Sequence, residues 1–180
     1  MSTASEYRPH YTVEDYRQWK GEWELWHGTA VAMTPSPFGR HALLLARAAQ
    51  VLGNAIDESD CDAVVLAEID WIISVDTVVR PDLTIVCGNV PERHVDSTPA
   101  LLVEILSDST RERDETVKKE LYQEQGVPWL LLIDPDSDSM SAFRIGESGQ
   151  YVEVSTAKQI SIDIRDSCRL SVEPNLLTGR

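Results

Sequence analysis

Carboxylates stand inside apolar stretches of the sequence, where charged side chains are rare. Glu104 interrupts "LLVEIL", Asp82 lies within "VVRPDLTIVCG", and Glu24 lies within "EWELWHG". A carboxylate that is buried without a compensating partner costs several kcal/mol. Convergence on one divalent cation would compensate these acids, because Mg²⁺ and Mn²⁺ favour carboxylate oxygens and keep water molecules for chemistry. The sequence therefore predicts a metal site that contains them.

The side-chain alternation of β-strands allows Asp82 and Glu104 to meet. Along an extended chain Glu104 shares a face with Leu106, and Asp82 shares a face with Thr84. If the two strands are neighbours in one sheet, both carboxylates can face a single cleft. Neighbouring strands are therefore the structural condition for the site.

Each acid also has a purely structural explanation. Glu104 alone fits an acid at a sheet edge or an ion pair with Arg80. Glu24 alone fits a solvated hairpin acid, and Glu22, on the same strand face, is an alternative upstream ligand. The combination of acids favours a site over these separate explanations.

Hydrophobic periodicity and turn residues predict helices and strands around these acids. Helices are expected at 12–20, 39–57 and 109–126, and a hairpin at 22–33 with its turn near His27-Gly28. Strands are expected at 63–74, 77–87, 100–106, 129–134, 140–145, 151–154 and 160–164. "WLLLID" is typical of the centre of a sheet, and "TPSP" is a breaker.

Length and composition predict the overall organisation. The 180 residues and 42% hydrophobic content fit one mixed α/β domain, 1–180, whose N-terminal arm at 1–11 is loose. Cys61, Cys87 and Cys168 lack CxxC spacing, so we expect reduced, mostly buried thiols. No leader peptide and no apolar run of membrane-spanning length are evident, so we expect a cytoplasmic protein without a membrane partner.

The net charge opposes binding to a polyanion. The chain has 16 basic and 30 acidic residues, which gives a net charge of −14. Non-specific affinity for nucleic acid comes mainly from Lys and Arg on phosphates. A nucleic-acid partner would therefore require the fold to gather the few basic side chains.

The order of the acids resembles the PD-(D/E)XK phosphodiesterases, which have the restriction endonuclease-like fold. Pro81-Asp82 stands for the PD and Glu104 for the second acid, but Leu106 occupies the lysine position. The chain resembles more closely the Uma-two family, a family of proposed endonucleases in that superfamily, over almost its whole length. The matching motifs are "T.EDY" (12–16), "EL..G" (24–28), "M.PSP...H" (33–41), "PDL" (81–83), "P.L.VE.LS.ST" (99–110), "D...K...Y" (114–122) and "GVP....IDP" (126–135).

The resemblance implies a restriction endonuclease-like core with flanking helices and metal-assisted hydrolysis of phosphodiester bonds in DNA. Asp82 and Glu104 would hold Mg²⁺ or Mn²⁺, and Glu24 would be a further or water-bridged ligand. The family is thought to have moved its lysine to the next helix, where Lys118 matches. This lysine would orient or help deprotonate the attacking water and stabilise the scissile phosphate. Its neighbour Lys119 is expected to point elsewhere.

Other residues near these motifs are candidates for substrate contact. They are His41, Tyr122 and Arg111, and each has a structural alternative: His41 as a capping histidine, Tyr122 as a core-edge tyrosine, and Arg111 in an ion-paired helix start. We expect Asp114 and Glu115 to belong to that solvated helix start.

Three functions remain open at this point. The first is an active Mg²⁺-dependent endonuclease with DNA as its partner. The second is a nuclease-fold binding or accessory protein, catalytically weak or inactive, with a homodimer as one form of it; the acidic composition favours this alternative. The third is a hydrolase of small phosphodiesters, for which the net charge matters less.

Overall fold

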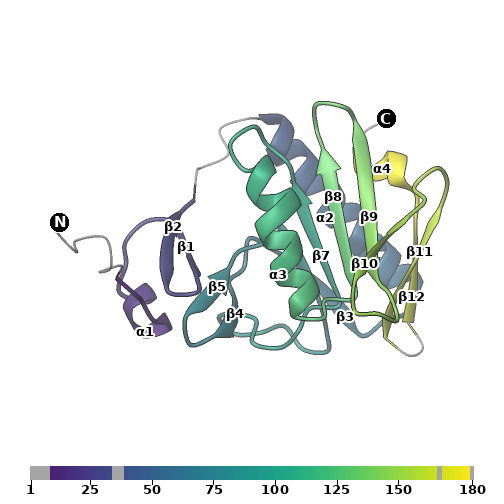
Figure 1. Ribbon diagram of the computed structural model, residues 1–180. Coiled ribbons are helices and arrows are strands. Elements are labelled where there is room, and N and C mark those ends of the chain that lie inside the picture. Colours follow the sequence, from purple (N-terminus) through teal and green to yellow (C-terminus); the bar gives the residue numbers. More distant parts are fainter. Residues whose placement is uncertain (1–8, 34–38, 166–167, 179–180) are drawn as a thin grey trace.

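The computed structural model describes residues 9–33, 39–165 and 168–178, and the structural statements below refer to these residues. The predicted breaker at 34–37 and most of the predicted arm at 1–11 lie outside them. The described chain forms a mixed α/β structure with a large sheet, a smaller sheet and a two-stranded ladder (Figure 1).

The large sheet has six strands in the order β10-β9-β8-β7-β6-β3, and only β7 and β8 pair in parallel. Its strands are β3 (Ala63–Ala67), β6 (Leu83–Cys87), β7 (Leu101–Ile105), β8 (Trp129–Asp134), β9 (Ser139–Ile145) and β10 (Tyr151–Val154). The apolar "WLLLID" strand, β8, lies inside the sheet as predicted.

Helices cover both faces of this sheet, which explains why β7 and β8 carry mostly apolar side chains on both faces, with Glu104 as the buried exception in β7. Helix α2 (Gly39–Glu58) packs on one face, and the π-helical segment η1 (Arg113–Lys118), continued by α3 (Lys119–Glu124), covers the other (Figure 1). Leu101, Val103 and Ile105 join the core on the α2 side, whereas Leu102 joins the core on the α3 side. This alternation places Glu104 on the η1–α3 face.

The smaller sheet has the order β2-β1-β5-β4 and is accompanied by the short helix α1. Its elements are α1 (Val13–Tyr16), β1 (Trp23–Trp26), β2 (Thr29–Ala32), β4 (Trp71–Ser74) and β5 (Thr77–Val79). The predicted hairpin is confirmed: His27 and Gly28 both have positive φ, 47° and 77°, as tight hairpin turns require. A Cβ on Gly28 would also collide with the ring of His10.

The predicted strands 63–74 and 77–87 are wrong in extent, because each divides between the two sheets. The chain turns at Glu68, whose φ of 49° interrupts an extended strand. Pro81, which has no N–H for a ladder, stands between β5 and β6. The segments 68–70 and 80–82 therefore join the sheets, and this junction positions the acids of the predicted site.

Two predicted helices also differ in extent. Helix 12–20 is only α1, although its capping box between Thr12 and Asp15 is present as predicted. Helix 109–126 begins after residue 110 and is π-helical in its first half. Asp114, Lys118 and Tyr122 recur at four-residue spacing, and all three are buried side chains of this segment.

The C-terminal part contains elements that the sequence pattern did not reveal. They are β12 (Cys168–Val172), which pairs with β11 (Ile160–Arg165), and α4 (Pro174–Thr178). The strand β11 therefore does not continue the meander of β8, β9 and β10.

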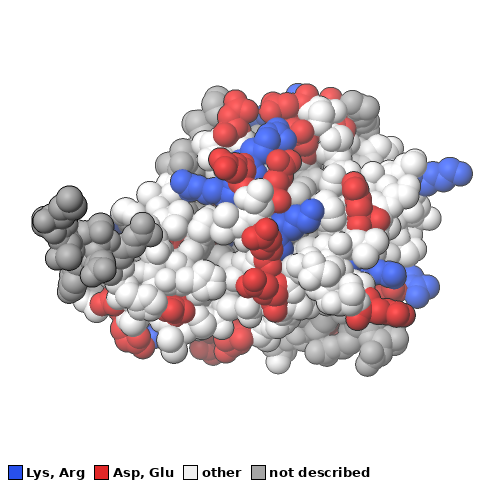
Figure 2. Space-filling model, viewed as in Figure 1, with Lys and Arg blue, Asp and Glu red and all other residues white. Residues whose placement is uncertain are grey.

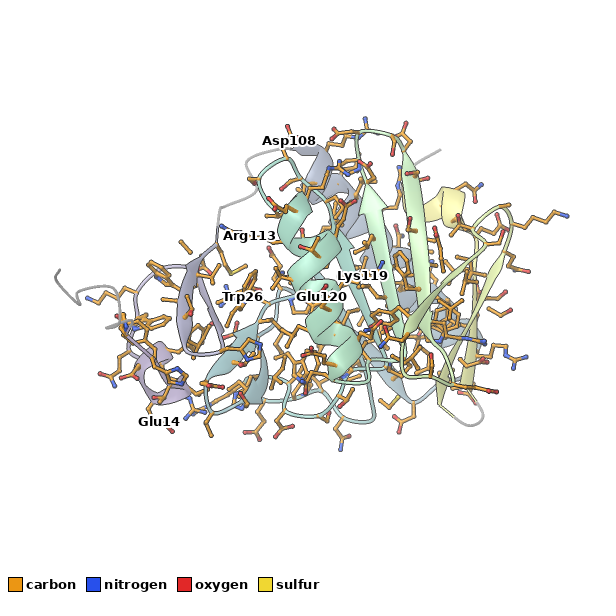
Figure 3. The ribbon with its side chains drawn as sticks, in the orientation of Figure 1. Glu14, Trp26, Asp108, Arg113, Lys119 and Glu120 are labelled. Carbon is orange, nitrogen blue, oxygen red and sulfur yellow. A yellow bond between two sulfur atoms is a disulfide. The ribbon has the colours of Figure 1, made fainter. Side chains whose placement is uncertain are left out.

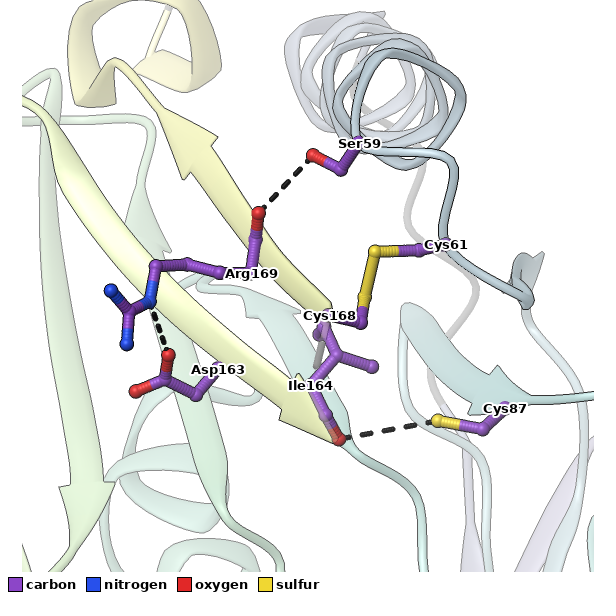
Figure 4. Close-up of a disulfide and its surroundings, with 7 residues drawn as sticks. All are labelled: Ser59, Cys61, Cys87, Asp163, Ile164, Cys168 and Arg169. Carbon is purple, nitrogen blue, oxygen red and sulfur yellow. Dashed lines mark hydrogen bonds and ion pairs between the residues drawn. A yellow bond between two sulfur atoms is a disulfide. The ribbon is translucent and has the colours of Figure 1, made fainter. Parts of the chain in front are cut away.

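The expectation of reduced thiols is wrong for Cys61 and Cys168, which form a disulfide (Figure 4). Their Cα atoms are 5.5 Å apart although 107 residues separate them in the sequence. The bond joins the connection between α2 and β3 to the start of β12. Cys87 is a free thiol whose Sγ lies 4.0 Å from the Ile164 carbonyl. In the described residues, no helix is long and apolar enough to cross a membrane.

Candidate active site

Asp82 and Glu104 meet because β6 and β7 are antiparallel neighbours. Leu83 pairs with Val103, so Asp82, one residue earlier, lies opposite Glu104. Oδ2 of Asp82 accepts a hydrogen bond from the Ile105 N–H at 2.6 Å. Both carboxylates line one cleft, which confirms the condition on neighbouring strands.

Glu104 is 2% exposed, and hydrogen-bond donors from the η1–α3 segment compensate its charge. Its Oε1 accepts a hydrogen bond from the Tyr122 hydroxyl at 2.5 Å and another from Lys118 Nζ at 3.1 Å. Burial raises the pKa of Glu104 well above its usual value, and the charge of Lys118 opposes this rise. The anomalous strand acid is thus held by two side chains one helical turn apart.

Lys118 is the only lysine within the described part of the chain that is buried, and it faces carboxylates from several elements. Nζ lies 3.1 Å from Glu104 Oε1, 3.2 Å from Glu24 Oε1 and 3.7 Å from Asp114 Oδ1. Burial alone would lower the pKa of Lys118, but Glu104, Glu24 and Asp114 raise it above its usual value. The ammonium therefore remains charged and acts as a hydrogen-bond donor, not as a proton acceptor.

Lys119 points away from this cluster, as predicted. Figure 3 shows Lys119 on the side of α3 that faces the strands, and its Nζ lies 3.5 Å from the centroid of the Phe143 ring. Arg113 Nη1 donates a hydrogen bond to the Ala32 carbonyl at 3.3 Å, and Glu120 is exposed. The neighbouring lysines therefore have different environments, which makes Lys119 a control for Lys118.

Asp114 is a buried residue of the cleft, contrary to its expected place in a solvated helix start. It is 3% exposed and lines the cleft one turn before Lys118. Burial raises the pKa of Asp114 to about 6, while Lys118 and a hydrogen bond with Thr110 oppose the rise. The sequence signal was the four-residue spacing of Asp114, Lys118 and Tyr122, which places them along one helical face.

The upstream acids Glu22 and Glu24 have different partners. Glu24 is 3% exposed, and its Oε1 accepts a hydrogen bond from the Arg80 N–H at 2.7 Å. Glu22 is exposed and pairs with the Arg80 guanidinium at the rim of the cleft. The Arg80 guanidinium also donates to Asp70 at 2.7 Å. Glu24 contacts Lys118 Nζ at 3.2 Å but is not among the described residues that line the cleft, whereas Glu22 lines the cleft and does not contact Lys118 in the ion pairs described.

The three predicted substrate contacts are placed differently. Nε2 of His41 lies 3.3 Å from Oδ1 of Asp82 inside the cleft, and this hydrogen bond raises the His41 pKa despite partial burial. Tyr122 is fully buried and reaches Glu104, which agrees with its core alternative. Arg111 forms ion pairs with Asp134, at 2.9 Å, and with neighbouring acids, which agrees with the ion-paired alternative.

The cleft has a volume of about 510 Å³ and an acidic lining. Its charged side chains are Glu22, Glu68, Asp82, Glu104 and Asp114 on the acidic side, and Arg80 and Lys118 on the basic side. Figure 2 shows acidic and basic side chains intermixed over the η1–α3 face, without a continuous basic stripe on that face. The described charges therefore favour a cation in the cleft over a bare polyanion.

The residues of the cleft fit a divalent cation in part. In the described chain, no group of three or more His, Cys, Asp and Glu side chains is arranged to hold a metal ion. However, Asp82 and Glu104 both line the cleft, and Mg²⁺ is commonly held by one or two carboxylates with water as the other ligands. A site with two protein carboxylates fits this geometry better than a site with three.

Comparisons with known proteins agree with this fold. The sequence model of the Uma2 family, described as "Putative restriction endonuclease", matches residues 13–173. The structure is similar to the crystal structure of "a putative nuclease belonging to DUF820 from Anabaena variabilis ATCC 29413", with a TM-score of 0.74 and 16% sequence identity. That similarity covers 94% of this chain and 98% of the other. No curated protein matches the sequence. The chain therefore belongs to the Uma2 family and shares the fold of the Anabaena protein.

Proposed function

We propose that the protein is an endonuclease that hydrolyses phosphodiester bonds in DNA with Mg²⁺ or Mn²⁺ as cofactor. The observation that carries this proposal is the placement of Asp82 and Glu104 side by side in one cleft, with the charged Lys118 beside them. Membership of a family described as "Putative restriction endonuclease" supports the choice of reaction and substrate.

Asp82 and Glu104 are the proposed metal ligands. A divalent cation held there would lower the pKa of a bound water and neutralise charge on the reacting phosphate. The Ile105 N–H and His41 orient the Asp82 carboxylate, and Tyr122 orients Glu104. These contacts fix the ligand oxygens before a substrate arrives, which is the condition for an effective site.

Lys118 is the proposed electrostatic group of the reaction. Because its ammonium remains charged, it donates hydrogen bonds to the attacking water or to a non-bridging phosphate oxygen. This role requires no proton transfer from water to the lysine. The assignment therefore favours orientation and charge stabilisation over general-base catalysis by Lys118.

The acidic cleft makes DNA binding dependent on the cation. Without it, the described acids of the lining outnumber Arg80 and Lys118, and they repel phosphate. A bound divalent ion inverts the local potential beside Asp82 and Glu104. We therefore expect short DNA duplexes to bind much more tightly with Mg²⁺ or Ca²⁺ than with a chelator.

The test is cleavage of plasmid and short duplexes in Mg²⁺ or Mn²⁺ by the wild-type protein, Asp82→Asn and Glu104→Gln. Loss of a primary ligand should reduce the rate by about 100-fold or more, because metal stabilisation of the transition state is lost. Glu120→Gln, at an exposed position of α3, is the matched control and should cleave at the wild-type rate. Equal cleavage by Asp82→Asn, or none by the wild type, contradicts the proposal.

Specific observations favour the two other functions. Lys118 is already ion-paired with Glu104, which leaves that carboxylate less available to a metal ion. The net charge of −14 disfavours binding to nucleic acid. Both observations fit a binding or accessory protein, including a homodimer. The cleft volume of about 510 Å³ suits a small phosphodiester. Calorimetry with Mn²⁺ tests the accessory-protein alternative, which predicts that the wild type shows no saturable Mn²⁺ binding that Glu104→Gln abolishes.

Hydrolysis of bis(p-nitrophenyl) phosphate but not of DNA would indicate the hydrolase of small phosphodiesters.

A further inference from the structure

The Lys118 ammonium is surrounded by carboxylates that do not all face the cleft. Glu104 on β7 and Asp114 on η1 line the cleft, whereas Glu24 on β1 is not among the described lining residues. The Lys118 side chain is 8% exposed, and the side chains of these acids are 3–4% exposed. The contacts are therefore shielded from water, where ion pairs depend strongly on geometry.

Glu24 is fixed in place by the backbone of another element. The same atom, Oε1, accepts the Arg80 N–H at 2.7 Å and lies 3.2 Å from Lys118 Nζ. Arg80 belongs to the junction between the two sheets, immediately before Pro81-Asp82. The carbonyl of Arg80 also accepts a hydrogen bond from Lys118 Nζ, at 3.5 Å. Glu24 of the smaller sheet and the Arg80 carbonyl of the junction thus both contact the Lys118 ammonium.

Asp114 completes this arrangement from the lysine's own helical segment. Its Oδ1 lies 3.7 Å from Nζ, four residues before Lys118. If Glu104 turns an oxygen to a divalent cation, Glu24 and Asp114 remain as counter-ions of the ammonium, and the N–H that Glu104 accepted becomes available to water or phosphate. A lysine with Glu104 as its sole partner would lose its counter-ion when the metal binds.

We infer that Glu24 and Asp114 are positioning residues that form an anionic seat for the Lys118 ammonium, and that Glu24 is not a metal ligand. The seat keeps Nζ beside the Asp82–Glu104 pair, where the water and the phosphate react in the proposed function. The inference rests on that function for its catalytic meaning. The contacts among Lys118, Glu24 and Asp114 themselves do not require a metal.

The first experiment measures the accessibility of Lys118 without metal. The protein is acylated with acetic anhydride in a chelator, and modification of Lys118 is quantified by mass spectrometry relative to Lys119. We expect slow modification in the wild type and an increase of about 10-fold or more in Glu24→Gln and in Asp114→Asn, because an ammonium released from these contacts becomes more accessible to the reagent. Glu22→Gln is the matched control and should leave Lys118 protected. Unchanged protection in both seat variants overturns the inference.

The second experiment separates a seat from a ligand. Mn²⁺ binding is measured by calorimetry for the wild type, Glu24→Gln and Glu104→Gln. If Glu24 is part of the seat, Glu24→Gln should keep the wild-type Mn²⁺ affinity within about 3-fold, while Glu104→Gln should lower the Mn²⁺ affinity by about 10-fold or more. Equal losses in the two variants would make Glu24 a ligand and overturn the inference. Absence of Mn²⁺ binding by the wild type contradicts the proposed function alone, because the acylation result still decides the seat.

Kinetics then report the positioning effect in an active protein. Glu24→Gln should lower kcat by about 10-fold or more with little change in KM, because the substrate still binds but Nζ is misplaced. The Lys118→Met/Glu24→Gln double variant should be no slower than Lys118→Met, since Glu24 acts through the lysine. A further loss in the double variant would show that Glu24 acts independently of Lys118.

Discussion

Two cations on the η1–α3 side of the molecule each face several carboxylates, but their environments differ. The contacts are Lys118 with Glu24, Glu104 and Asp114, and Arg111 with Glu115, Asp134 and Asp136. The Lys118 side chain is 8% exposed and the Arg111 side chain 31%. In the exposed network, the Arg111 hydrogen bond lowers the pKa of Asp134. In the buried network, burial raises the pKa of Asp114 and of Glu104.

This difference shows that burial decides what an ion pair does. Water screens the charges around Arg111, so the ion pairs of Arg111 contribute little to the free energy of unfolding, although they hold the start of the helical segment in place. Around Lys118 the carboxylates have lost their hydration, so their protonation and geometry depend on one ammonium. Carboxyl groups with perturbed pKa values that gather in a cleft mark a candidate functional site.

The largest expected effect on stability is that of removing the buried cation. Lys118→Met should lower the free energy of unfolding by about 3–5 kcal/mol at neutral pH, because desolvated carboxylates lose their counter-ion. Urea denaturation in a chelator measures this change. Lys119→Met, one residue away and stacked on Phe143, should cost about 1 kcal/mol or less. Similar losses in the two variants would remove the contrast between the networks.

An intermediate effect should appear in the pH dependence of stability. The pKa of Asp114 is about 6 in the folded protein, above the ordinary carboxyl value of 3.8. The folded state therefore binds more protons between about pH 4 and pH 6, so the Asp114 contribution to stability decreases as pH rises through this range. It should amount to about 2–3 kcal/mol.

Asp114→Asn isolates this contribution. The variant lacks the titrating group, so its stability relative to the wild type should increase from about pH 4 to about pH 7. Urea denaturation at several pH values measures the difference. Asp136→Asn, in the exposed network, is the control and should show little change. A relative stability of Asp114→Asn that is constant or decreasing across this range contradicts the raised pKa.

The smallest effect is expected for Arg111, the more exposed of the two cations. Arg111→Met should change the free energy of unfolding by about 1 kcal/mol or less, because solvent-exposed ion pairs contribute little. The change should shrink further at about 1 M salt, where the screening length is only about 3 Å. Denaturation at low and high salt tests both points. A loss comparable with that of Lys118→Met would mean that exposure does not distinguish the two networks.

The meeting of Asp82, Glu104 and Lys118 in one cleft could be predicted, because local patterns and the family motifs indicated it. The apolar surroundings of Asp82 and Glu104 indicated strand acids, and the motif of the family pointed to Lys118. The predictions of burial failed where the neighbours of a residue in the sequence differ in character from its neighbours in the folded structure. Asp114 has Arg113 and Glu115 beside it in the sequence, which is typical of a solvated helix, yet the fold buries it against Lys118.

The sequence by itself determined the local elements: the hairpin turn at His27-Gly28, the apolar strand β8, and the spacing of Asp114, Lys118 and Tyr122. These depend on neighbours within a few residues, so their side chains suffice to encode them.

Only the tertiary structure decided which distant groups meet. The division of 63–87 between two sheets, the contact of Glu24 with Lys118, and the disulfide between Cys61 and Cys168 all join residues far apart in the chain. Such contacts depend on the joint packing of many elements, which no local pattern specifies. The same packing removes water from the acids around Lys118, and so decides that these charges form a candidate site.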